Sequence, residues 1–475
     1  MVRLILAVHN HQPVGNFDHV IRQAFDLSYR PFTEVLRGHP SIRAVMHFSG
    51  ILYDWLEKNE PGYLDGLRGL SAGGRIELMG GGYYEPILAI LPEEDRRGQI
   101  ARMRDYINGR FGAEPGGVWL AERVWEPQLA ETLAAAGARY TVLDDIHFFS
   151  AGLAEKDLTG YFITESGGRN LPVFPINSRL RYLIPFADPE RTIEYLRGFE
   201  GRDAVLVMAD DGEKFGLWPK THDLVYRRRW LDRFLSLLEE NSSWLRTSTF
   251  SESLSDSGSR GLVYLPTTSY HELSQWALPP EPSGRLAGMW KNVPDDMRPY
   301  LRGGYFRNFF SKYPESNSAY RKMLRVSSAV REAGGAGKES LWKAQCNCGY
   351  WHGVFGGVYL PHIRRAIHSN LLAAASETVR PSGFEVTEED WDADGRPELL
   401  VESGKAGFYF APAKGGGLWE WDSLPRQVNY CSVLSRYPEP YHGGEGAEDI
   451  TGSRARDLKG RVFYDWHRRM SLLDH

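Results

Sequence analysis

Two groups of carboxylates in this chain are placed for acid–base chemistry. Glu122 lies between Trp119 and Trp125 after a short apolar run, and Asp210 and Asp211 end another such run. Cleavage of a glycosidic bond with retention uses two carboxyl groups about 5–5.5 Å apart, one as nucleophile and one as acid and base. We predict such a pair here. Because strand residues alternate, only one of the two adjacent aspartates can face a given substrate atom. A helix cap or an ion pair is the structural alternative for each carboxylate.

Histidine and cysteine pairs raise the question of a metal. His9 and His11 alternate at the end of an apolar run, so a strand would place both on one face, where they could bind a metal or hydrogen-bond to buried backbone. Cys346 and Cys348 are too close for an ordinary disulfide and lack a second cysteine pair for zinc. With Cys431 they make three cysteines, an odd and low number that suits a reducing compartment.

An acidic run near the C-terminus resembles a calcium-binding sequence. Asp390, Asp392 and Asp394 form Asp-x-Asp-x-Asp-Gly, but Glu398 stands at the wrong distance for a helix–loop–helix calcium site. We expect a solvated acidic turn, with a structural calcium as the alternative.

The elements that must position these groups follow one pattern in the first half of the chain. Short apolar runs end abruptly in polar or glycine-rich sequence, and segments of helical periodicity lie between them. The runs are 4–8, 42–46, 76–79, 118–120, 140–143, 171–176 and 204–208. Such runs predict parallel strands buried on both faces, and seven of them predict a closed (β/α)7 barrel of α/β class with polar groups at the C-terminal strand ends.

Composition changes after residue 280. Residues 279–284 are rich in proline and predict a break, and residues 297–333 and 360–379 have helical periodicity. After a second break at 380–383, short alternating segments predict an antiparallel β domain, and residues 461–475 predict an amphipathic helix. We therefore expect a catalytic barrel (1–280), a helical subdomain that completes the cleft (281–380), and the N-terminal part of an apparently truncated β-sandwich (381–475).

Charge and hydropathy exclude two classes of partner. The 475 residues carry 56 Lys and Arg against 61 Asp and Glu, which gives no electrostatic basis for binding nucleic acid. Residues 4–8 are too short for a signal peptide, and no apolar stretch reaches transmembrane length. We expect a cytoplasmic protein without membrane contact.

Five motif regions resemble those of glycoside hydrolase family 57, most closely its 4-α-glucanotransferase and α-amylase-type members. The regions are His11–Pro13, Gly82–Pro86, Trp119–Pro127, Asp210–Trp218 and Tyr270–Pro279, in this order. The resemblance covers nearly the whole chain and implies a (β/α)7 barrel, a helical subdomain and a C-terminal β-sandwich. It implies a retaining enzyme on α-1,4-glucans and maltooligosaccharides that needs no cofactor, and it is compatible with a homodimer.

The resemblance also assigns roles. It implies Glu122 as nucleophile and Asp211 as acid and base. The substrate-binding residues that we carry over from the motifs are His11, Gln12, Glu85, Trp119, Asp210, Glu213, Trp218, Trp276, Tyr350, Trp351 and His352.

One residue departs from the family pattern. Glucanotransferases of the family usually have an aspartate before Tyr-Trp-His-Gly, where this chain has Cys348. A thiol is a weak acceptor for sugar hydroxyls, so the ratio of transfer to hydrolysis is open. Two other classes also remain as alternatives, a metal-dependent polysaccharide deacetylase and a non-catalytic glucan-binding protein. The deacetylase would need a histidine pair four residues apart, which the chain lacks.

Overall fold

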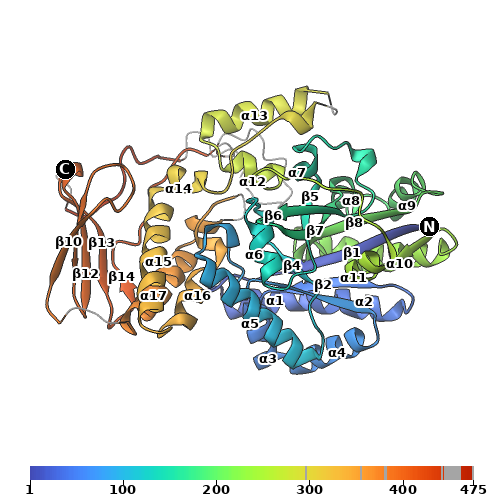
Figure 1. Ribbon diagram of the computed structural model, residues 1–475, viewed down its shortest axis with the longest axis horizontal. Helices are drawn as coiled ribbons and strands as arrows, with labels where there is room; N and C mark the ends of the chain where they lie inside the picture. The colour runs from blue at the N-terminus through green and yellow to red at the C-terminus, as the bar shows by residue number, and fades with distance from the viewer. Residues whose placement is uncertain (295–296, 354–355, 379–381, 440–441, 443–461, 473–475) are drawn as a thin grey trace.

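The molecule has three parts in a row. A computed structural model describes residues 1–294, 297–353, 356–378, 382–439, 442 and 462–472. Figure 1 shows a barrel that holds the N-terminus, a layer of helices beside it, and a small sheet at the opposite end. No helix in the described ranges is long and apolar enough to span a membrane.

Seven parallel strands form the barrel. The ring closes because β1 pairs with both β2 and β8. Its members, in spatial order, are β1 (Val2–Asn10), β2 (Ala44–Phe48), β3 (Ile76–Gly81), β4 (Gly117–Trp119), β5 (Tyr140–Asp144), β7 (Arg169–Ile176) and β8 (Ala204–Asp211). Outside the ring, β6 (Phe162–Ser166) pairs antiparallel with β7, and β9 (Leu245–Thr247) pairs with the first residues of β1. The predicted α/β class and (β/α)7 barrel are confirmed, each strand coinciding with one of the seven apolar runs.

Alternate residues of each strand face the barrel interior. On β1, Ile5 and Ala7 belong to the interior cluster, whereas Leu4 and Leu6 pack with the surrounding helices. Both sets are buried, which explains why the runs are apolar without alternation.

Helices cover the outside of the barrel (Figure 1). They are α1 (Asp18–Ala24), α2 (Arg30–Gly38), α3 (Gly50–Asn59), α4 (Pro61–Ala72), α5 (Glu93–Phe111), α6 (Leu129–Ala135), α7 (Asp145–Phe149), α8 (Ser178–Leu183), α9 (Pro189–Arg197), α10 (Trp230–Glu240), α11 (Phe250–Asp256) and α12 (His271–Trp276). Gly112 ends α5 at φ 67°, a left-handed conformation that glycine adopts without steric cost.

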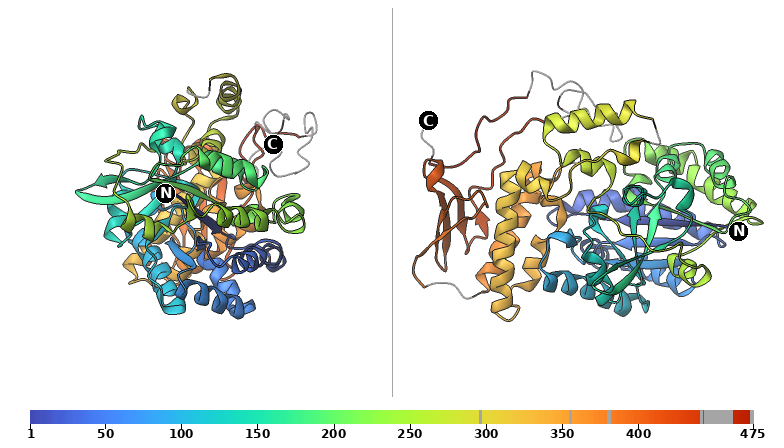
Figure 2. Two further views of the ribbon diagram at one scale, coloured as in Figure 1. Left: turned by 90° about the vertical axis from the view of Figure 1, so that its right-hand side faces the viewer. Right: turned by 45° about the horizontal axis from the view of Figure 1, so that its top comes forward.

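The second part is helical, and the third is an antiparallel sheet; the right-hand view of Figure 2 shows them in this order. The helices are α13 (Pro280–Asn292), α14 (Asn308–Lys312), α15 (Pro314–Glu332), α16 (Lys338–Ala344) and α17 (Pro361–Ser376). The strands are β10 (Glu385–Glu389), β11 (Glu398–Glu402), β12 (Ala406–Ala411), β13 (Gly417–Ser423) and β14 (Val428–Asn429). Lys322 of α15 forms buried ion pairs with Glu420 and Asp422 of β13, at 2.9 and 2.5 Å. Buried charge therefore joins the sheet to the helical part.

Two local expectations were wrong. The proline-rich break at 279–284 begins α13, because proline fits the first turn of a helix. The helical periodicity over 297–333 is confirmed as α14 and α15, which follow a short 3₁₀ turn, Arg298–Tyr300. Over its described part, 462–472, the predicted C-terminal helix is irregular, and Ser471 pairs with Leu418 of β13.

Candidate active site

Strand alternation turns Asp211, and not Asp210, towards the interior of the barrel. The inward-facing residues of β8 are Val205, Val207 and Ala209, and Asp211 continues this series in register with His9 of β1. Asp210 points the other way and is 2% exposed. Of the two aspartates that the sequence left open, Asp211 is thus the one at the barrel mouth.

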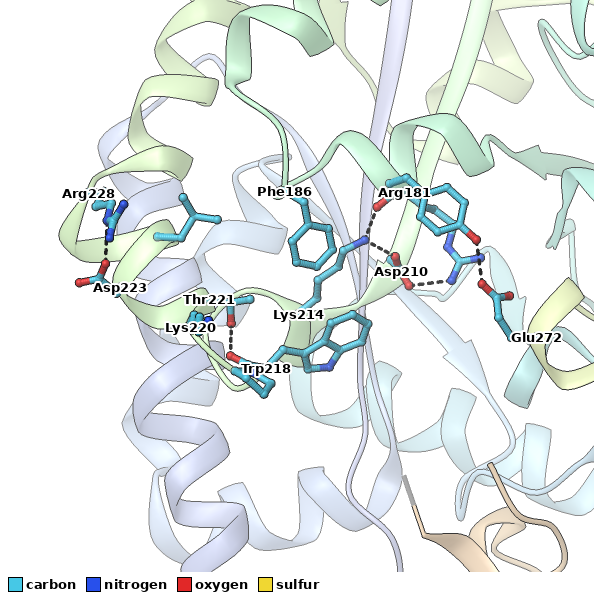
Figure 3. A pocket seen from close by; sticks show the side chains of 13 residues that line it. Arg181, Phe186, Asp210, Lys214, Trp218, Lys220, Thr221, Asp223, Arg228 and Glu272 are labelled. Carbon is cyan, nitrogen blue, oxygen red and sulfur yellow. Dashed lines mark hydrogen bonds and ion pairs between the residues drawn. The ribbon is translucent and has the colours of Figure 1, made fainter. Parts of the chain in front are cut away.

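Asp210 is held by two cations, as Figure 3 shows. Lys214 Nζ lies 2.6 Å from one carboxylate oxygen, and Arg181 Nη2 lies 3.2 Å from the other. Burial would raise the pKa of Asp210, but the charges of Arg181 and Lys214 outweigh it and hold this pKa below its usual range. Asp210 therefore stays ionised.

The opposite shift occurs at its neighbour. Burial, followed by the negative charge of Asp210, raises the pKa of Asp211 to about 7. Two adjacent carboxyl groups whose environments push their pKa values apart are the usual arrangement for a general acid. Asp211 can therefore carry a proton near neutral pH, whereas Asp210 remains as a negative charge beside it.

Glu122 sits in a strained turn after β4. In the 3₁₀ turn η3 (Ala121–Arg123), Glu122 and Arg123 have φ of 53° and 45°, a region that residues other than glycine rarely occupy. The turn is held by Ser269 Oγ, which donates to the carbonyl of Glu122 at 2.5 Å, and by Tyr270, whose hydroxyl donates to the Glu122 carboxylate at 2.7 Å. Backbone strain that the surroundings maintain is typical of functional positions.

Glu122 and Asp211 line one cleft of about 680 Å³. Trp276 and Trp351, stacked at 6.2 Å, form part of its wall, and Trp218 lies at its edge. Of the predicted substrate-binding residues, those that line the cleft are Gln12, Glu213, Trp218, Trp276 and Trp351. Acidic groups with flat aromatic walls match the shape and polarity of a sugar ring.

Hydrogen bonds from the residues that follow β1 hold the side chain of Glu213. Gln12 donates to the Tyr29 hydroxyl at 2.9 Å, and that hydroxyl donates to Glu213. The backbone N–H of His11 donates to the same Glu213 oxygen at 3.1 Å. Glu213 is thereby positioned at the cleft although its partners come from distant parts of the sequence.

Glu85 lies under the cleft rather than in its wall. It is 3% exposed, and its two oxygens face His9 Nε2 at 3.5 Å and His47 Nε2 at 3.9 Å. His9 and His47 contact each other through their Nδ1 atoms at 2.8 Å. Burial raises the pKa of Glu85 to about 8 and lowers that of His47 to about 3. A neutral polar layer thus supports the floor of the site.

The structure places several predicted aromatic and histidine residues away from the cleft wall. Trp119 packs on His9 at 4.6 Å inside the barrel, and Trp125, fully buried, donates to the carbonyl of Leu265. Tyr350 is also fully buried and donates to the carbonyl of Ala344, and His352 contacts the carbonyl of Gly356. These residues therefore support the site from buried positions and do not line the cleft.

His9 and His11 belong to different groups. His9 joins His47 and Glu85, whereas Nε2 of His11 lies 3.2 Å from Sγ of Cys348, which lines the cleft. The departure from the family pattern at Cys348 therefore lies at the catalytic end of the barrel.

A second hollow of about 740 Å³ adjoins the cleft (Figure 3). Both are lined by Arg181, Trp218 and Glu272. Phe186 stacks with Trp218 at 6.2 Å, and 58% of Tyr182 is exposed. The aromatic surface thus continues beyond Asp210.

The acidic run of the sheet is partly neutralised. Lys414 Nζ lies 2.8 Å from Asp392 and 2.8 Å from Asp394, so both aspartates are paired with a cation. The cluster with oxygen atoms close enough to share an ion is Asp390, Asp392 and Glu398.

A closed seven-stranded barrel with two carboxyl groups on one aromatic cleft is the architecture of a barrel glycosidase. Comparison with known proteins identifies the family: residues 5–266 match the family model "Glycosyl hydrolase family 57", and the chain belongs to this family. Residues 304–378 and 390–475 match the middle and C-terminal domains described as alpha-amylase/4-alpha-glucanotransferase.

Named relatives are similar over the whole chain. A 4-alpha-glucanotransferase of Thermococcus kodakarensis is 43% identical, covering 100% of this chain and 75% of the relative. Alpha-amylase 1 of Dictyoglomus thermophilum is 42% identical over 99% and 71%. The crystal structure of the 4-alpha-glucanotransferase from Thermococcus litoralis superposes with a TM-score of 0.92 at 42% identity, covering 99% of this chain and 72% of that one.

The sequence analysis missed several residues that hold Glu122, Asp210 and Glu85 in place. Tyr270 was part of a motif but had no role, and Arg181, Lys214 and His47 were not singled out. Only the position of Tyr270 at the start of its motif could have indicated it. Lys214 lies within the motif region Asp210–Trp218 but received no role, whereas Arg181 and His47 lie outside the five motif regions, and the fold alone brings them to the site.

Proposed function

We propose that this protein is a retaining 4-α-glucanotransferase on maltooligosaccharides and starch-like α-1,4-glucans. The names of the relatives support the substrate class. The observation that carries the mechanism is the placement of Glu122 and Asp211 on one cleft, with the pKa of Asp211 raised to about 7.

The reaction has two halves. Asp211, protonated, gives its proton to the glycosidic oxygen while Glu122 attacks the anomeric carbon. Asp211, now ionised, then removes a proton from the acceptor hydroxyl, which displaces Glu122. The hydrogen bond from Tyr270 orients Glu122 for attack. A sugar hydroxyl as acceptor gives transfer, and water gives hydrolysis.

We place the sugar chain along the aromatic surface. Trp276 and Trp351 would stack on rings at one side of the scissile bond. On the other side the chain would pass Trp218 towards Phe186 and Tyr182 in the second hollow. His11 and Glu213 would bind sugar hydroxyls near the scissile bond.

The second candidate is an α-amylase, which the names of other relatives support. Maltotriose separates the two activities. A ladder of longer oligomers is expected for transfer, whereas glucose and maltose without longer products would establish hydrolysis.

Glu122→Gln tests the mechanism. Loss of the nucleophile is expected to lower turnover of maltooligosaccharides at least about 1,000-fold. Glu131→Gln, at an exposed carboxylate of α6, is the matched control and should keep full activity. Unchanged turnover in Glu122→Gln would refute the proposed nucleophile, and a binding protein without catalysis would show no turnover in the parent.

Cofactor, assembly and location complete the proposal. We propose that no cofactor is required, and that the acidic cluster at Asp390, Asp392 and Glu398 is the place where calcium would bind. Activity that is lost with a chelator and restored by a transition metal would instead favour the deacetylase alternative.

We also propose a homodimer, which sedimentation tests. The three free cysteines support a reducing, cytoplasmic location.

A further inference from the structure

His11, Cys346 and Cys348 meet at the floor of the cleft. One nitrogen and two sulfur atoms of these residues lie within 4.8 Å of one another, and His11 Nε2 is 3.2 Å from Cys348 Sγ. Zn²⁺ binds thiolate sulfur at about 2.3 Å and imidazole nitrogen at about 2.0 Å in tetrahedral geometry, so ligand atoms around one ion lie about 3.5–4 Å apart. The three side chains can therefore reach a single ion with small adjustments.

The loop that carries the two cysteines is held in place. In the 3₁₀ turn η8 (Asn347–Gly349), Asn347 donates to the carbonyl of Glu85 twice, from its backbone N–H at 3.1 Å and from Nδ2 at 2.7 Å. Trp351 Nε1 donates to the Asn347 side-chain oxygen at 2.9 Å. A Cβ at Gly349 would lie 2.5 Å from Ile367, so the turn packs tightly on α17. Fixed ligands lose little entropy on binding an ion.

The charge around the group favours a cation. The carboxylate of Glu122 acts electrostatically on Cys348, and the carboxylate of Glu213 lies beside His11, whose backbone N–H donates to it at 3.1 Å. Cys346 is buried, whereas Cys348 lines the cleft together with Glu122. An ion bound here would have protein on one side and the cleft on the other.

We propose that His11, Cys346 and Cys348 form a binding site for a thiophilic divalent cation such as Zn²⁺, which competes with glucan for the cleft. Both thiols bind as thiolates and His11 binds as neutral imidazole, and the protons that these three groups carried are released to solvent on metal binding. Three protein ligands leave a fourth position open to water, as in catalytic zinc sites with two cysteines and one histidine. The ion would fill the space beside Glu122, so occupancy and glucan binding exclude each other. The inhibitory part rests on the proposed function, whereas the metal site does not.

Metal binding can be measured without turnover. Reduced, metal-free protein is titrated with Co²⁺, and the expected result is one ion per chain with the absorption of cobalt–thiolate bonds, which Zn²⁺ abolishes by displacement. Cys346→Ser and Cys348→Ser should each weaken the binding at least about 100-fold, more than loss of an outer partner of a metal ligand costs. Cys431→Ser, far from the cluster along the chain, is the matched control and should bind like the parent.

Inhibition is measured separately. Zn²⁺ should raise the apparent KM for maltooligosaccharides without lowering kcat in the parent and in Cys431→Ser, and a chelator should reverse the effect. Absence of the cobalt–thiolate signal in the parent would overturn the site. So would metal binding that persists in both cysteine variants, because it would belong to another group such as His9, His47 and Glu85. Thiolate binding without competition would overturn the inhibitory role alone.

Discussion

At the scale of single residues, burial and the charge of a neighbouring carboxylate raise the pKa of the proposed acid. Asp210 and Asp211 are chemically identical in the sequence, and the pKa of one is lowered while that of the other is raised. Arg181 and Lys214 take up the charge of Asp210, which in turn raises the pKa of Asp211. Besides burial, the pKa of the acid is thus set by Asp210, whose own charge is held by Arg181 and Lys214.

This arrangement predicts a pH profile. The acid must be protonated in the free enzyme, so kcat/KM should fall as the pH rises through about 7, the pKa of Asp211. Asp210→Asn removes a charge that raises this pKa, so the alkaline limb should move to lower pH. Asp105→Asn, at an exposed carboxylate of α5, should leave the limb in place. An unchanged limb in Asp210→Asn would show that Asp210 does not tune the acid.

At the scale of elements, the turn after β8 follows Asp211, carries Glu213 and depends on one glycine. Gly216 has φ of 137°, and a Cβ there would collide with the carbonyl oxygen of Leu27 and lie 2.9 Å from the Tyr226 ring. The turn therefore has room only for glycine.

Gly216→Ala is expected to cost on the order of 3 kcal/mol of unfolding free energy, since both the backbone and the neighbouring chain must shift. Activity should fall as well, because the turn positions Glu213. Gly109→Ala in α5 is the control: a Cβ there meets nothing within 4 Å, and alanine favours the helix by about 0.5–1 kcal/mol. Equal stability of the two variants in thermal unfolding would contradict the role of Gly216.

At the scale of the whole molecule, ion pairs join the C-terminal sheet to the helices. Besides Lys322, Arg325 of α15 bonds to Glu389 and Glu402 of the sheet, at 2.9 and 2.6 Å. The sheet has a small core of its own around Trp391, Tyr409 and Trp419. Its stability should therefore depend on its contact with α15.

Lys322→Met would leave Glu420 and Asp422 buried without their cation, at a cost of about 3–5 kcal/mol. Limited proteolysis should then cut within residues 382–439 before the barrel. Lys343→Met, which removes a half-exposed pair with Glu339, should cost less than about 1 kcal/mol. Equal protection of the sheet in both variants would show that the Lys322 pairs do not hold it.

The sequence by itself determined the barrel and predicted carboxylates at its mouth. Continuous apolar runs such as 204–208 identify strands buried on both faces, and parallel strands bring their C-terminal ends together, so Glu122 and one of Asp210 and Asp211 could be predicted to lie at one mouth, and the family resemblance pointed to Asp211. Helix boundaries near proline were less predictable, as at α13, because proline both interrupts and begins helices.

Only the tertiary structure decided which side chains surround these carboxylates. Cys346 and Cys348 lacked further metal ligands in the sequence, and His11 comes from the opposite end of the chain, 337 positions before Cys348. Arg181 of α8 likewise reaches Asp210, and Tyr270, the residue before α12, reaches Glu122. A local sequence pattern predicts a strand because a strand that is buried on both faces must be apolar along its own length. Contacts across a closed barrel depend on the fold of the whole chain, which no local pattern contains.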